Sequence, residues 1–145
     1  IEKYVKTENF HLTYGDGLSN VDLKKLVEFH IEHKKIATVT AVRPPSRFGE
    51  MTINSNNVVE DFEEKSQMNT GYINGGFFVL NKGIMDLLDT DPMCDLEFGP
   101  MQELAKNKKL MAFRHNGFWQ CMDNVRERDF LNSLVTKNKA PWIKW

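Results

Sequence analysis

The sequence predicts a single α/β domain that spans residues 1–145. Short apolar runs rich in β-branched residues alternate along the chain with segments whose apolar residues recur at helical spacing. Hydrophobic residues make up 41% of the chain and charged residues 27%, values that are typical of a globular domain. A chain of this length can bury a core of its own, and no internal repeat or linker divides it.

The first predicted elements are a strand, a helix and a second strand. His11–Tyr14 resembles a strand and ends in a Gly-Asp-Gly turn. Ser19 is predicted as the helix N-cap, with Asp22 at capping-box spacing, and apolar residues continue at helical spacing to about His33. Ile36–Val42 is apolar and β-branched, as in a buried strand. This order predicts a βαβ unit whose two strands form a parallel pair.

The middle of the chain predicts a loop, a hairpin and an interrupted strand. Consecutive prolines place Arg43–Gly49 in a loop. Glu50–Ile53 and Val58–Phe62 flank a run of Asn and Ser residues that favours a hairpin turn. Tyr72–Leu80 is predicted as a strand that Gly75-Gly76 interrupts with a bulge or a close approach to a ligand.

Helices and strands alternate again in the last part of the chain. The predicted elements are a helix over Lys82–Leu88, a helix from Pro100 to about Lys106, a strand over Leu110–Arg114 and a helix over Asn124–Val135.

Charge, hydropathy and cysteine content exclude several functional classes. The chain has 19 basic and 20 acidic residues, a net charge of −1, so we expect no nucleic-acid binding and no basic membrane surface. Its longest apolar run, Phe77–Leu80, is too short to cross a bilayer, and the first residues predict no secretory signal. Cys94 and Cys121 form no C-x-x-C motif and are predicted to be reduced thiols in a cytoplasmic protein.

Two aspartates are the first candidate site residues. Asp16 lies between two glycines at a strand end, and Asp123 follows an aromatic stretch before a helix. Each has a simpler interpretation, because Asp16 suits a turn and Asp123 suits a helix N-cap. A fold that joined their carboxylates could hold one divalent cation between them, as phosphate chemistry requires.

Other polar groups have both a functional and a structural interpretation. Glu64 and Lys65 could bind sugar hydroxyls and a phosphate, or belong to a solvated charge run. Asn74-Gly75-Gly76 could present an amide and bare backbone to a sugar, or form a β-bulge. His30 and His33 are interpreted as ordinary surface and core histidines, since no third metal ligand is near them in sequence. For the tryptophans of the tail, packing is favoured over base stacking.

Several motifs occur in order along nearly the whole chain. They are Leu12–Gly17, Thr40–Pro45, Arg47–Gly49, Phe62–Lys65, Ile73–Val79, Met111–His115, Gly117–Gln120, Met122–Asp123 and Ala140–Trp142. Through them the chain resembles the sugar-1-phosphate nucleotidyltransferases, and most closely the glucose-1-phosphate cytidylyltransferases.

The resemblance implies both a fold and a reaction. The fold is a mixed, mostly parallel sheet of the nucleotide-diphospho-sugar transferase, Rossmann-like type, without its N-terminal nucleotide-binding strands. The reaction joins glucose 1-phosphate to CTP and gives CDP-glucose and pyrophosphate. A phosphate oxygen of the sugar attacks the α-phosphorus in line, while the metal and a lysine stabilise the developing charge.

The same resemblance implies the site residues. Asp16 and Asp123 would ligate Mg²⁺, and Lys65 would act on the sugar phosphate as the catalytic residue. The sugar pocket would be lined by Gly49, Glu64, Lys65, Asn74 and Gly75, with Glu64 at the glucose hydroxyls.

One element of the family is absent from the 145 residues. Neither G-x-G-x-x-G nor G-x-x-x-x-G-K-[ST] occurs, and family members hold the triphosphate with a glycine-rich loop that bears an arginine. We therefore expect part of a cytidylyltransferase that is inactive as this chain alone. The alternative is a non-catalytic remnant that serves as a sugar-phosphate-binding or oligomerisation module. We also expect a homo-oligomer, because the strands that would pair with the strand before Asp16 are missing.

Overall fold

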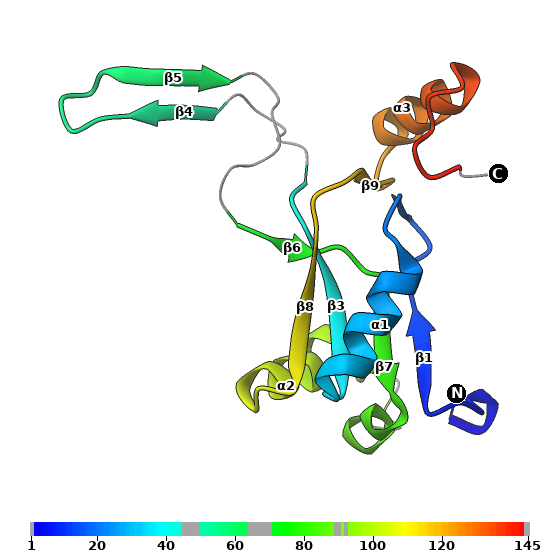
Figure 1. Cartoon of the computed structure of the whole chain (residues 1–145). Helices are drawn as coiled ribbons and strands as arrows, with labels where there is room; N and C mark the ends of the chain where they lie inside the picture. Colours follow the sequence, from blue (N-terminus) through cyan, green and yellow to red (C-terminus); the bar gives the residue numbers. More distant parts are fainter. Residues whose placement is uncertain (1, 45–49, 64–70, 89–90, 92, 144–145) are drawn as a thin grey trace.

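A computed structural model describes residues 2–44, 50–63, 71–88, 91 and 93–143, and Figure 1 shows how their elements are arranged. The strands are β1 (Asn9–Leu12), β2 (Gly17–Ser19), β3 (Ala37–Val42), β4 (Glu50–Ile53), β5 (Val59–Glu63), β6 (Ile73–Asn74), β7 (Phe78–Asn81), β8 (Leu110–His115) and β9 (Trp119–Cys121). The helices are η1 (Glu2–Tyr4), α1 (Leu23–His33), η2 (Lys82–Leu87), η3 (Glu97–Met101), α2 (Gln102–Lys106) and α3 (Val125–Thr136).

Five of the described strands form one mixed sheet around β3 (Figure 1). β3 pairs in parallel with β8 along its whole length. On its other side β3 pairs antiparallel with β7 and then with β6, and β1 pairs antiparallel with β7. β1, β3 and β8 therefore run in one direction and β6 and β7 in the other. This arrangement confirms the predicted α/β fold with a mixed sheet. Among the described strands only the β3–β8 pair is parallel, so the expectation of mostly parallel pairing is wrong.

The predicted parallel pair between the first two long strands is wrong. β1 and β3 run in the same direction and α1 connects them, but β7 lies between them and pairs with both. The parallel neighbour of β3 is β8. Both of these pairings join segments that are far apart in sequence, so the local strand–helix–strand pattern could not reveal them.

The N-cap of α1 is Asp22 and not Ser19. The Asp22 carboxylate accepts a hydrogen bond from the backbone N–H of Lys25 at 3.1 Å. Ser19 instead belongs to β2, and its hydroxyl donates to the carbonyl of Phe118 at 2.8 Å. The pairing of β2 with β9 keeps Ser19 in an extended strand, so Ser19 does not cap α1.

The predicted bulge at the double glycine is confirmed. β6 and β7 are separated by three residues that still bond to β3: the N–H of Gly75 donates to the Thr40 carbonyl at 2.9 Å, and the Thr40 hydroxyl donates to the Phe77 carbonyl at 2.8 Å. A Cβ on Gly75 would lie 2.6 Å from Val42 Cγ1, so the backbone can approach β3 this closely only at a glycine. Gly76 has a φ of +72°, which also favours glycine.

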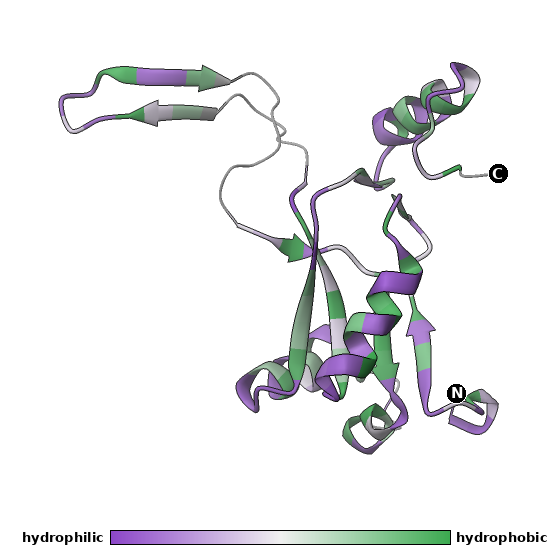
Figure 2. Ribbon diagram, viewed as in Figure 1, coloured by the Kyte–Doolittle hydropathy of each residue, from purple (hydrophilic) through white to green (hydrophobic). Residues whose placement is uncertain are grey.

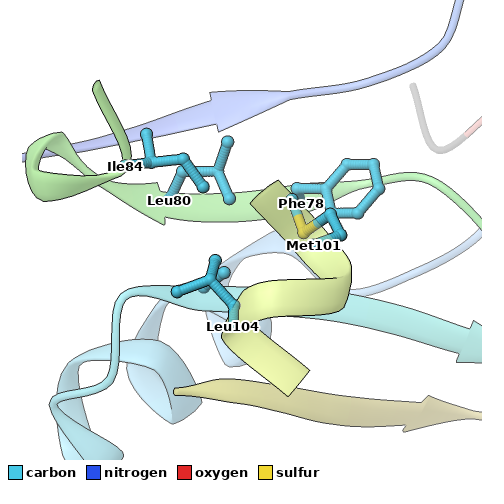
Figure 3. Close-up of a cluster of buried hydrophobic side chains, with 6 residues drawn as sticks. Phe78, Leu80, Ile84, Met101 and Leu104 are labelled. Carbon is cyan, nitrogen blue, oxygen red and sulfur yellow. The ribbon is translucent and has the colours of Figure 1, made fainter. Parts of the chain in front are cut away.

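Side chains of the sheet alternate between two covered faces. On one face, Ala37 of β3 belongs to the main core cluster, which is completed by Phe78, Leu80, Ile84, Met101 and Leu104 from β7, η2, η3 and α2 (Figure 3). On the other face, Thr38 contacts His30 of α1. Figure 2 shows hydrophobic residues along β3 and β7, whereas α1 carries both hydrophobic and hydrophilic residues.

The remaining predicted elements are largely confirmed. β4 and β5 form the expected antiparallel hairpin. The helix predicted to begin at Pro100 instead starts with η3 at Glu97, so Pro100 lies inside the helical segment and is buried. Of the helices in the described part of the chain, none is long and apolar enough to cross a membrane.

Candidate functional site

The two candidate metal ligands lie at the same end of the β2–β9 ladder. Asp16 directly precedes β2, and Asp123 lies two residues after β9. The register of this antiparallel pair sets Gly17 opposite Cys121. The ladder therefore joins the backbones of two aspartates that are far apart in sequence.

Asp16 opens onto a cleft of about 610 Å³ that Tyr14, Gly15 and Glu97 also line. Tyr14 and Asp16 come from the segment between β1 and β2, while Glu97 begins η3. The cleft thus contains two carboxylates, one of which the sequence pattern had indicated. Glu97 was not among the predicted site residues, because its neighbourhood in the sequence carries no motif that we recognised.

Asp123 takes part in a small polar cluster at the start of α3. Its Oδ2 accepts a hydrogen bond from the Cys121 thiol at 3.4 Å, and its backbone N–H donates to Glu127 Oε2 at 2.8 Å. The ligand atoms of these three residues lie within 4.8 Å of one another. Burial, followed by the hydrogen bond to Asp123, raises the pKa of the Cys121 thiol to about 11, so the thiol stays protonated at neutral pH.

The simpler interpretation of Asp123 as the N-cap of this helix is wrong. Asn124 is the N-cap of α3, and its Oδ1 accepts the backbone N–H of Glu127 at 3.1 Å. Asp123 precedes the cap, so its carboxylate has no capping role in α3.

Asn74 is held by the tyrosine of the cleft. Its Nδ2 donates to the Tyr14 hydroxyl at 2.7 Å, its Oδ1 accepts the N–H of Gly76 at 2.9 Å, and the Tyr14 hydroxyl in turn donates to Glu97 Oε1. Burial, and then the hydrogen bond to Glu97, raises the pKa of Tyr14 to about 12, so the phenol stays neutral at physiological pH. These hydrogen bonds connect Asn74 on β6 with the Glu97 carboxylate on η3.

Gly75 is tied to the β2–β9 ladder. It is buried, and its carbonyl accepts a hydrogen bond from Trp119 Nε1 at 2.8 Å. Trp119 belongs to β9, so this bond connects the bulge of the main sheet to the ladder that carries the two aspartates. The sequence prediction missed the roles of Tyr14 and Trp119, although both lie inside motifs that supported the resemblance.

The structure thus brings Asp16, Asp123, Asn74 and Gly75 into one connected region around the β2–β9 ladder and the bulge. Gly49, Glu64 and Lys65, the other predicted site residues, lie outside the described residues. β5 ends at Glu63, directly before that segment.

The histidines and the described tail tryptophan have structural roles. His30 is only 2% exposed, and its Nδ1 lies 2.8 Å from the Thr38 hydroxyl, which His33 Nε2 also contacts at 2.7 Å. His30 is therefore a core histidine and His33 is partly buried, in line with the interpretation of both as ordinary surface and core histidines. Trp142 stacks on Phe118 at 5.2 Å, which confirms that it packs on its own domain. Trp145 lies outside the described residues.

Comparisons with known proteins identify the family. A family model described as nucleotidyl transferase matches residues 1–123. Over 146 aligned residues the chain is 46% identical to glucose-1-phosphate cytidylyltransferase of Salmonella typhimurium, covering 100% of this chain and 56% of that protein. It is 37% identical over 142 residues to the probable glucose-1-phosphate cytidylyltransferase of Bacillus subtilis, covering 98% of this chain and 55% of that protein.

The fold has a counterpart among solved structures. A protein from Bacillus anthracis described as a glucose-1-phosphate thymidylyltransferase superposes with a TM-score of 0.64 at 19% identity, over 99% of this chain and 59% of that one. At this identity the likeness concerns the fold alone. The chain spans about half the length of the curated relatives it matches. Because the family model covers most of its residues, the chain belongs to the nucleotidyl transferase family.

Proposed function

We propose that this chain is the sugar-phosphate-binding and metal-binding part of a nucleotidyltransferase that joins glucose 1-phosphate to CTP. The products are CDP-glucose and pyrophosphate. The observation that carries the proposal is the 46% identity with the Salmonella cytidylyltransferase along the whole chain. The β2–β9 ladder supports the proposal, because it brings Asp16 and Asp123 to one end and the proposed metal site requires both carboxylates near one cation.

The residues present fit a hard divalent cation such as Mg²⁺. Asp16 and Asp123 supply carboxylate oxygens, which Mg²⁺ prefers, and Glu97 adds a second carboxylate to the cleft of Asp16. When bound, Mg²⁺ would offset the negative charge of the reacting phosphates. The ladder that joins the backbones of these two acids is connected through Trp119 to the bulge, where the sugar pocket is proposed.

The sugar pocket is proposed to form around Asn74 and Gly75. The Tyr14 hydroxyl and the Gly76 N–H each engage one end of the Asn74 amide, so its orientation is fixed before substrate binds. A second hydrogen on Nδ2 and a second lone pair on Oδ1 remain for sugar hydroxyls. By resemblance, Gly49 completes the pocket, Glu64 binds the glucose hydroxyls, and Lys65 stabilises the phosphate charge.

Turnover is not expected from these 145 residues alone. A triphosphate needs several donors, which the family supplies from a glycine-rich loop, and the sequence has no such loop. This observation also favours the second candidate function, a sugar-phosphate-binding or oligomerisation module without activity. The coding sequence upstream of Ile1 distinguishes the two, because a glycine-rich loop bearing an arginine there restores the complete enzyme.

Calorimetric titration with glucose 1-phosphate in the presence of Mg²⁺ tests the pocket. A charge-assisted contact contributes about 1.5–3 kcal/mol, so Lys65→Ala should weaken binding roughly tenfold or more. Lys24→Ala is the matched control, because the Lys24 side chain is exposed on α1 and forms only a surface ion pair with Glu28. No heat at millimolar glucose 1-phosphate, or equal weakening by both substitutions, would contradict the proposed pocket. Pyrophosphate release from glucose 1-phosphate and CTP by this chain would contradict the expected inactivity.

A further inference from the structure

Two arginines lie against one tyrosine ring beside the bulge. The guanidinium carbon of Arg43 is 5.0 Å from the centre of the Tyr72 ring, and that of Arg114 is 5.6 Å from it. Arg43 directly follows β3, Tyr72 directly precedes β6, and Arg114 belongs to β8. Three neighbouring strands therefore contribute one side chain each to this group, which we call the Arg–Tyr–Arg cluster.

The strand register places the cluster on the same face of the sheet as Asn74. Ala41 pairs with Asn74 on β6 and with Arg114 on β8, so all three point to one face. Arg43 and Tyr72 each lie two residues from a member of this row, and the pleat returns them to the same face. Adjacent strands are about 4.8 Å apart, so Arg114 and Asn74 are separated by roughly 10 Å of backbone.

The two guanidinium groups have no acidic partner in the described part of the chain. The ion pairs there involve other cations, and among the described residues the guanidinium groups of Arg43 and Arg114 contact the Tyr72 ring. The Nε–H of Arg43 is buried and donates to no acceptor among the described residues. A donor removed from water and left unbonded is costly. The exposed guanidinium of Arg114 lies against the same ring, so an anion bound there can satisfy the buried donor of Arg43 and the charge of both cations.

We infer that the Arg–Tyr–Arg cluster is a phosphate-binding subsite. A guanidinium group presents a planar fork of N–H donors that matches phosphate oxygens, and a phosphate dianion carries enough charge for two of them. The Tyr72 ring orients both guanidinium groups through cation–π contacts. The subsite does not include Lys65, the lysine that the resemblance assigns to the sugar phosphate, and its existence does not depend on the proposed reaction.

The phosphate has two possible sources that share this chemistry. One is the phosphate of a sugar phosphate bound at Asn74, which lies on the same sheet face. The other is free phosphate or pyrophosphate. Titrations with glucose 1-phosphate, inorganic phosphate and pyrophosphate distinguish the sources, because only the first carries a sugar that reaches Asn74.

Side-chain NMR of the unmodified chain provides the direct test. The sequence contains five arginines, so their Nε–Hε resonances can be assigned by substitution. Inorganic phosphate or pyrophosphate should shift the Arg43 and Arg114 resonances and leave Arg126, which is exposed on α3, unchanged. If glucose 1-phosphate shifts the same two resonances together with the Asn74 amide, the source is the sugar phosphate. Equal shifts at all described arginines, or none, would overturn the inference.

Substitution gives the second test. Arg43→Gln and Arg114→Gln should each weaken pyrophosphate binding about tenfold or more, whereas Arg126→Gln should leave it unchanged. Arg43→Lys and Arg114→Lys keep the charge but lose the fork, so partial weakening in these folded variants separates recognition from misfolding. Unchanged pyrophosphate affinity in both lysine and glutamine variants would overturn the subsite. Lys65→Ala should not affect pyrophosphate binding here, which keeps this outcome distinct from a failure of the proposed function.

Discussion

The buried hydroxyl of Thr38 offers a sharp test of how the sheet is joined to α1. Thr38 is fully buried, and its Oγ1 contacts His30 Nδ1 at 2.8 Å and His33 Nε2 at 2.7 Å. His30 Nε2 faces Asn9 Oδ1 at 3.2 Å, and the N–H of Lys35 donates to His33 Nδ1 at 2.9 Å. These partners define one consistent donor and acceptor for each of these four hydrogen bonds.

In this direction both imidazoles are neutral. Because Asn9 Oδ1 accepts, His30 carries its proton on Nε2, and its Nδ1 accepts from the Thr38 hydroxyl. The oxygen of Thr38 then accepts from His33 Nε2, while His33 Nδ1 accepts from the backbone. The Thr38 hydroxyl therefore connects both histidines of α1 to β3.

Thr38→Val keeps the volume of the side chain and removes both hydrogen bonds. Each neutral bond contributes about 0.5–1.5 kcal/mol, and the nearly inaccessible His30 nitrogen would be left without a partner. We therefore expect the free energy of unfolding to fall by about 2–3 kcal/mol. Urea denaturation followed by circular dichroism should show a lower midpoint with an unchanged slope.

Thr136→Val is the matched control. The exposed Thr136 hydroxyl donates to the Asn132 carbonyl at 3.0 Å within α3, so its loss should change stability by no more than about 0.5 kcal/mol. A Thr38→Val variant as stable as this control would refute the inferred direction of the bonds and their contribution to the fold.

Three further predictions concern pH, metal and assembly. Burial lowers the pKa of both His30 and His33 below the ordinary 6.5. The charges of His33 and His11 lower the pKa of His30 further. For His33 a backbone hydrogen bond and Glu32 oppose the effect of burial on the pKa, while Lys35 adds to it. The unfolded chain therefore binds protons first, so unfolding free energy should decrease as pH falls from 6.5 towards the lowered pKa values; an increase in that window would contradict this. Asp16→Asn and Asp123→Asn should each weaken Mg²⁺ binding, because oxygen ligands at roughly 2.0–2.1 Å require both carboxylates to converge; a structure with these carboxylates on opposite faces would rule the site out. Within the described residues β1 pairs on one side only, so light scattering at micromolar concentration should give a mass well above 16.9 kDa, and a stable monomer would refute the expected homo-oligomer.

Local patterns were sufficient for most single elements. The β-branched run before Arg43 predicted β3, and the Asn-rich turn predicted the β4–β5 hairpin. The double glycine predicted the bulge, because glycine has no side chain to pack and weakens the interior of a strand. Each of these features depends on residues that are neighbours in the chain or on the steric limits of one residue. Such local features can be inferred from the sequence alone.

The candidate site was predictable only as a set of residues. Asp16 and Asn74 belong to motifs that the sequence displays, and the resemblance assigned them to one pocket. Their actual connection runs through Tyr14 and Glu97, which are separated by most of the chain. No local pattern marks Glu97 as a partner of Tyr14, since the contact exists only after η3 packs against the sheet.

The sequence by itself determined the α/β class, the elements with strong periodicity and the glycine bulge, since these follow from local sterics and hydrophobic spacing. Only the tertiary structure decided that β7 separates β1 from β3, that Asp22 rather than Ser19 caps α1, and that Arg43 and Arg114 meet at Tyr72. These outcomes depend on which strands pair across long stretches of chain. Such pairings are set by the burial of the whole sheet, which no short segment of sequence encodes.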